Sequence, residues 1–133
     1  MRISIPAKRF DALARLAGDG RALELGIGTG RVAIPLAARG VDVRGIEASQ
    51  AMIDRMRAKP GGAAIPVTVG DFTNVAVEGE YAVIYLVFST LYGLLTQDAQ
   101  IACIREAAGR LGRGGAFVVE ADPKRFEQGQ RVQ

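Results

Sequence analysis

Three alternate glycines follow a short apolar stretch near the N-terminus of the chain: Gly26, Gly28 and Gly30. Residues without a Cβ permit a tight turn from a strand into a helix and let a ligand approach the backbone closely. The dinucleotide fingerprint requires glycine at its first, third and sixth positions, but Arg31 stands at the sixth position here. Glu24, two residues before the first glycine, would repel a phosphate and attract an ammonium or sulfonium group. The pattern indicates a ligand that is cationic near this loop.

Two more carboxylates stand at the ends of later predicted strands. Glu47 ends the stretch 41–47, where a carboxylate can accept hydrogen bonds from both hydroxyls of a ribose. Asp71 follows the stretch 63–70 and can accept a hydrogen bond from an exocyclic amine, while the ring of Phe72 can flank a purine. With the cationic group near the glycines, these residues describe an adenosine that carries a cationic amino-acid tail. That ligand is S-adenosylmethionine.

A parallel sheet would bring these residues to one edge, and the sequence has the required alternation of strands and helices. Helices are predicted at 10–17 and 31–39, after Ser49, and from Thr96 to a stop at Gly112. The run 81–88 is almost continuously apolar, which is typical of a central strand covered on both faces. The five predicted strands are 21–25, 41–47, 63–70, 81–88 and 115–121.

This order predicts a single α/β domain over residues 1–133. We expect a Rossmann-like, doubly wound parallel sheet of about five strands with helices on both faces, and a ligand beyond the carboxyl ends of the strands.

The composition narrows the classes of partner. The 17 basic and 14 acidic residues give a net charge of +3, without a run of like charges, so we expect no nucleic acid partner. No apolar run approaches the roughly 18 residues that span a membrane. The chain has one cysteine, Cys103, and no histidine, so it can form no internal disulfide and offers no spacing typical of a zinc site. We interpret Cys103 as a small, buried hydrophobic residue. We expect a cytoplasmic protein with no membrane partner.

Several stretches together resemble the class I S-adenosylmethionine-dependent methyltransferases: LELGIGTGRVAIPLAARG, VRGIEAS, VGDF, YLVFSTLYGLLTQDAQ and GGAFVVEA. The resemblance extends over nearly the whole chain. It implies that Glu24 and the glycine loop surround the methionine portion of the cofactor. It also implies that Glu47 holds the ribose, and that Ala48 and Met52 pack against the adenine.

The same resemblance covers the later strands. It implies that Asp71 bonds the adenine amino group, and that Phe72 contributes its backbone amide and an apolar edge. The backbone at Leu86 and Val87 would border the methyl group, and the product would be S-adenosylhomocysteine. The stretch FSTLYGLLTQ is similar to a subgroup that methylates small molecules, including amines of sugars. We therefore expect a small-molecule acceptor.

The chain departs from the family at both ends. Members usually carry helices before the first strand and two more strands after the fifth, whereas here about twenty residues precede the first and thirteen follow Glu120. The chain is a fragment of a longer enzyme, a reduced member, or one that completes itself with another copy. Without the last strands, the stretch 117–120 would present an unpaired edge. We hypothesise a homodimer that forms through this fifth-strand edge.

No catalytic residue is assigned. Methyl transfer is an in-line displacement that depends on alignment of donor and nucleophile and need not use a general base. Tyr85, Tyr92, Glu120 and Asp122 fall near strand ends, but no motif supports any of them, and Tyr85 is better interpreted as packed inside the sheet.

Two alternatives remain open. One is a truncated module that binds the cofactor without transferring its methyl group. The other is an NAD-dependent oxidoreductase, which Arg31 and Glu24 disfavour.

Overall fold

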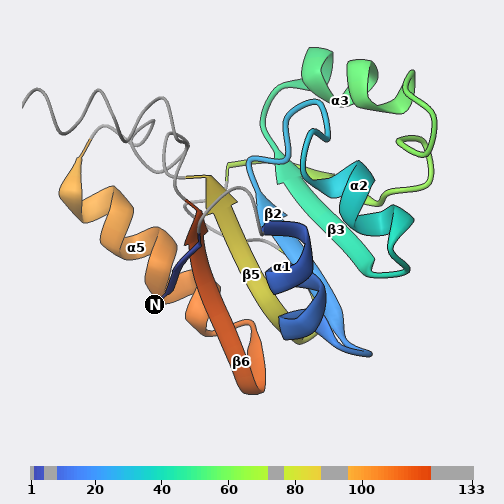
Figure 1. Ribbon diagram of the computed structural model, residues 1–133. Coiled ribbons are helices and arrows are strands. Elements are labelled where there is room, and N and C mark those ends of the chain that lie inside the picture. Colours follow the sequence, from blue (N-terminus) through green and yellow to red (C-terminus); the bar gives the residue numbers. More distant parts are fainter. Residues whose placement is uncertain (1, 5–8, 72–76, 88–95, 121–133) are drawn as a thin grey trace, which may run out of the picture.

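The computed structural model of the chain describes residues 2–4, 9–71, 77–87 and 96–120. Within these residues, six strands form one sheet in the order β1-β6-β5-β2-β3-β4, and every neighbouring pair runs parallel (Figure 1). The strands are β1 (Arg2–Ser4), β2 (Arg21–Leu25), β3 (Asp42–Glu47), β4 (Val67–Val69), β5 (Tyr81–Val87) and β6 (Leu111–Glu120). The predicted α/β parallel sheet is confirmed, with β5 inside it between β6 and β2.

Helices cover both faces of this sheet: α1 (Arg9–Ala17), α2 (Ala33–Ala38), α3 (Gln50–Arg57) and α5 (Gln97–Ala108). One buried core contains Leu13 of α1, Leu36 of α2 and Met56 of α3. A second core contains Cys103 and Ala107 of α5, which Figure 1 shows apart from the other three helices. The sheet therefore separates two apolar layers, as expected for a doubly wound fold.

Strand β5 contributes to both layers. Val83 and Tyr85 belong to the core with α1, α2 and α3, whereas Ile84 and Leu86 belong to the core with α5. Because successive side chains of a strand point to opposite faces, a strand covered on both faces must be apolar at every position. This explains the continuous apolar run in the sequence.

Two helices begin at the residues that the sequence indicates. The Ser49 hydroxyl accepts a hydrogen bond from the Met52 N–H at 3.3 Å, and the Thr96 hydroxyl accepts one from the Ala99 N–H at 3.0 Å. Each bond satisfies an N–H that the first turn of the helix leaves without a partner. The predicted caps of α3 and α5 are confirmed.

Other boundaries differ from those predicted. Helix α2 begins at Ala33, which places Pro35 in the first turn, where an N–H would have no helical partner. Helix α5 ends at Ala108, before Gly112, and β6 starts already at Leu111. Strand β4 keeps only three residues of the predicted stretch 63–70.

The edge beside β6 is occupied, and the prediction that it is unpaired is wrong. Arg2, Ile3 and Ser4 of β1 lie opposite Val118, Val119 and Glu120 of β6 in a parallel ladder. Backbone groups of β1 thus take the place that we assigned to a second copy of the chain. The free edge on which we based a homodimer is absent over these residues.

The thiol of Cys103 provides a test of the core beneath α5. Burial, with a smaller contribution from the negative charge of Asp71, raises the pKa of this thiol from 9.0 to about 11. At pH 8, native Cys103 should therefore contain about 100-fold less thiolate than the unfolded chain and should react correspondingly slowly with a disulfide reagent. The rate of thiol modification, with and without denaturant, measures this difference.

The same pKa sets a pH dependence of stability. Between pH 9 and 11 the unfolded chain releases the thiol proton while the folded chain retains it, so the free energy of unfolding should fall over this range. The Cys103→Ala chain should lack this part of the pH dependence. Equal reaction rates in the native and unfolded chains would contradict a buried Cys103.

Candidate functional site

The glycine loop between β2 and α2 folds back onto the carboxyl end of β3. The N–H groups of Gly26 and Ile27 both donate to the Ile46 carbonyl, at 2.9 and 3.0 Å. All three loop glycines have left-handed φ angles: 69° at Gly26, 60° at Gly28 and 82° at Gly30. At Gly30 a Cβ would also lie 2.7 Å from Met56 Cγ, so both conformation and packing require glycine there.

The carboxylate of Glu47 connects this loop with the start of α3. Its Oε1 accepts a hydrogen bond from the Gly28 N–H at 2.8 Å, and its Oε2 accepts one from the Ser49 N–H at 3.0 Å. The side chain is half-buried at the end of β3. Bonds to an ionised carboxylate are stronger than bonds between neutral groups, so Glu47 fixes the position of the loop relative to α3.

Glu24 lies deeper, at the base of the loop. Its side chain is 2% exposed, and its Oε1 accepts a hydrogen bond from the Tyr85 hydroxyl at 3.0 Å. Tyr85 is fully buried, which confirms that it packs inside the sheet. Because a buried carboxylate is costly without hydrogen bonds, the two side chains depend on each other.

The remaining predicted contacts spread around the same edge. Ala48 and Met52 are exposed at the start of α3, and Met52 Sδ would lie 3.8 Å from a Cβ at Gly28. Asp71 is exposed beyond β4, and its charge acts on Cys103. Val69 is 57% exposed at the end of β4 in register with Glu47, an apolar residue that the sequence analysis did not single out.

The last predicted contacts follow β5. The side chain of Leu86 is fully buried against α5. At this edge of the sheet, a ligand could therefore contact the backbone of Leu86 but not its side chain. Val87 is in register with Glu120 of β6. Phe72, Tyr92 and Asp122 lie outside the described residues, as does the side chain of Glu120.

Parallel strands bring these residues to one edge of the sheet. Glu24 is in register with Gly45 and Tyr85, and Glu47 is in register with Val69. The carboxyl ends of β2, β3, β4 and β5 therefore meet, as predicted (Figure 1). The edge combines a glycine loop, the carboxylates of Glu24, Glu47 and Asp71, and exposed apolar side chains.

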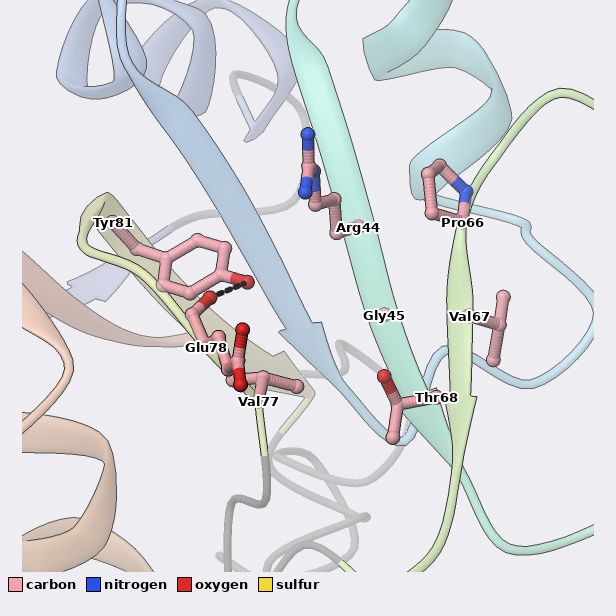
Figure 2. A pocket seen from close by; sticks show the side chains of 8 residues that line it. All are labelled: Arg44, Gly45, Pro66, Val67, Thr68, Val77, Glu78 and Tyr81. Carbon is pink, nitrogen blue, oxygen red and sulfur yellow. Dashed lines mark hydrogen bonds between the residues drawn. The ribbon is translucent and has the colours of Figure 1, made fainter.

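A separate cavity of about 300 Å³ lies over β3 and β4, on the same face of the sheet as α5 (Figure 2). Arg44 and Thr68 line one side of the cavity. On the other side, the Tyr81 hydroxyl donates to the Glu78 carbonyl at 3.3 Å. Its lining includes none of the predicted cofactor residues, so it is distinct from the edge described above.

Neither a metal-binding cluster nor a membrane-spanning helix is present in the part of the chain that the structure describes. No group of three or more His, Cys, Asp and Glu residues there could hold a metal ion. None of the helices in that part is long and apolar enough to cross a lipid bilayer.

The sequence matches known proteins over most of its length. The model of a family described as "Methyltransferase domain" matches residues 22–115. The cypemycin N-terminal methyltransferase of a Streptomyces species is 30% identical over 112 residues, which cover 83% of this chain and 46% of that protein. The CcbJ methyltransferase from Streptomyces caelestis is 45% identical with a TM-score of 0.76, over 85% of this chain and 46% of CcbJ.

The fold is shared more widely. CalS10, an amino pentose methyltransferase from Micromonospora echinaspora solved with S-adenosylmethionine bound, has a TM-score of 0.74 at 23% identity, over 87% of this chain and 49% of CalS10. The chain spans about half the length of these relatives. The family match over residues 22–115, together with the parallel sheet and its glycine loop, shows that this chain belongs to the methyltransferase-domain family with a Rossmann-like fold.

Proposed function

We propose that this chain binds S-adenosylmethionine and transfers its methyl group to a small-molecule acceptor, releasing S-adenosylhomocysteine. The observation that carries the proposal is the glycine loop held by Glu47 above the buried carboxylate of Glu24. Two carboxylates beside a loop favour a cationic ligand over a phosphate. Bound there, the cofactor supplies a methyl group on a sulfonium, which is electrophilic without a metal ion.

Each residue of the edge has a role in this proposal. Glu24 attracts the ammonium group of the amino-acid tail, and the glycine loop lets that tail lie against the backbone. Glu47 uses one lone pair of each oxygen for the Gly28 and Ser49 N–H groups, which leaves a second lone pair on each for a ribose hydroxyl.

The other contacts hold the adenine and the methyl group. Ala48 and Met52 pack against one face of the adenine, and we add Val69 as a second apolar contact because of its exposure and its register with Glu47. Asp71 accepts a hydrogen bond from the adenine amino group, beside Phe72. The backbone at Leu86 and Val87 borders the methyl group.

The chain contributes to methyl transfer by aligning the donor with the acceptor. No residue is assigned as a catalytic base. The name of the cypemycin relative refers to an N-terminal reaction, so an amine is the acceptor group to try first. We place the protein in the cytoplasm on the basis of its composition, with one buried cysteine.

A cofactor-binding module without transferase activity is the second candidate. It is favoured by the described edge itself, where each residue with an assigned role contacts the cofactor and none is assigned to the acceptor. The two candidates share the cofactor and differ only in turnover, so a labelled methyl group separates them. Label transferred to a primary amine supports the enzyme, whereas tight cofactor binding without transfer to any amine supports the module.

Calorimetric titration tests cofactor binding directly. We expect the purified chain to bind S-adenosylmethionine and S-adenosylhomocysteine with a Kd of order 1 μM, or about −8 kcal/mol. NAD serves as the control and should not bind, because Arg31 occupies the sixth position of the dinucleotide fingerprint, where glycine is required. Circular dichroism shows whether the chain is folded. A folded chain that binds neither adenosyl ligand, or binds NAD instead, would refute the proposal.

Substitution of Glu47 tests the ribose contact. Glu47→Gln keeps the shape of the side chain but removes its charge and one acceptor, and should weaken S-adenosylhomocysteine binding by about 1–3 kcal/mol. Asp42→Asn, an exposed carboxylate at the other end of β3, is the matched control and should bind normally.

A pair of nucleosides separates ribose binding from ordering of the loop. The wild-type chain should prefer adenosine to 2′-deoxyadenosine in an NMR titration, and Glu47→Gln should lose that preference. If the variant weakens both nucleosides equally, Glu47 acts only through its bonds to the Gly28 and Ser49 N–H groups, and the ribose assignment fails.

A further inference from the structure

Tyr85 and Glu24 lie side by side on two adjacent strands at the centre of the sheet. They are in register on the adjacent strands β5 and β2, and the Tyr85 hydroxyl donates to Glu24 Oε1 at 3.0 Å. The exposed fraction is 0% for Tyr85 and 2% for Glu24. A hydrogen bond in such a buried position is shielded from water, so it fixes the direction of the carboxylate more firmly than an exposed bond would.

The opposite neighbour of Glu24 offers no such group. On its other side, Glu24 is in register with Gly45 of β3, which has no side chain. A Cβ at Gly45 would lie 2.5 Å from Ile27 Cδ1, so packing of the glycine loop keeps this position free of a side chain. Of the two residues in register with Glu24, Tyr85 is the one whose side chain donates to its carboxylate.

We propose that Tyr85 is a positioning residue that holds the Glu24 carboxylate in place for the ammonium group of the ligand's amino-acid tail. The inference rests on the proposed function, and adds a residue whose hydroxyl donates to Glu24 from within the sheet. It follows that Tyr85 should contribute to the affinity for ligands that carry the amino-acid tail. It should not contribute to the affinity for the adenosine portion alone.

Two ligands that differ only in this tail test the inference. S-Adenosylhomocysteine carries the ammonium group, and 5′-methylthioadenosine lacks the amino acid. In Tyr85→Phe, which removes only the hydroxyl, affinity for S-adenosylhomocysteine should fall about tenfold, the loss expected for one hydrogen bond to a charged group. Affinity for 5′-methylthioadenosine should not change.

Tyr81→Phe is the matched control. Tyr81 lies on the same strand and is 2% exposed, but its hydroxyl donates to the Glu78 carbonyl beside the cavity of Figure 2. This variant should bind both ligands as the wild type does. A double-mutant cycle with Glu24→Gln should show that the effects of Tyr85→Phe and Glu24→Gln on S-adenosylhomocysteine binding are not additive.

The outcomes are distinct. If Tyr85→Phe weakens both ligands equally, Tyr85 has only a structural role, and if it weakens neither, the hydrogen bond does not matter for binding; either result overturns the inference. A wild-type chain that binds neither ligand would refute the proposed function itself, and the inference with it.

A second measurement applies if Tyr85→Phe does not fold. The chain has three tyrosines, so the variant Tyr81→Phe with Tyr92→Phe leaves Tyr85 as the only one. Binding of S-adenosylhomocysteine should then change the ultraviolet absorption of tyrosine, and 5′-methylthioadenosine should change it much less. Equal changes with the two ligands would overturn the inference.

Discussion

The hydrogen bonds of Glu47 hold together the two segments that form the edge proposed for the ligand. One oxygen of the carboxylate accepts the Gly28 N–H of the glycine loop, and the other accepts the Ser49 N–H at the start of α3. The Ile46 carbonyl, one residue earlier, accepts two more N–H groups from the loop. A loop with three left-handed glycines has many conformations in isolation, so its single conformation here is imposed by the end of β3.

The two carboxylates of the site work in different environments. Glu47 is half-buried and bonds to backbone N–H groups, so its geometry follows from the path of the chain. Glu24 is almost fully buried and accepts a bond from the side chain of Tyr85, so its geometry depends in part on the identity of a residue on another strand. A substitution near Glu47 can be tolerated if the backbone is unchanged, whereas at position 85 few side chains other than tyrosine offer a donor at that reach.

The sequence was sufficient to predict the elements whose neighbouring residues show a clear pattern of burial or capping. The apolar run of β5 identified a central strand, and Ser49 and Thr96 identified the starts of two helices, because burial and capping leave a pattern in neighbouring residues. Strand β1 has only three residues and forms through its pairing with β6, so no local pattern indicated it. In the candidate site, spacing pointed to the glycines and Glu47, and the structure brings Gly28 and Glu47 into contact. The Tyr85 contact could not be found in this way, because it depends on the register between β2 and β5, which are far apart in the sequence.

The pairing of β1 with β6 also affects the order of folding. The first described strand finds its partner only in the last one, so this ladder forms between residues that are separated by almost the entire described chain. Contacts of such long sequence separation lose the most chain entropy when they form and slow the folding reaction. During synthesis on the ribosome, β1 emerges first but remains without its partner until β6 has been made. Among the described strands, the sheet can therefore assemble from β2 and β3 outward, and the pairing of β1 with β6 can form late.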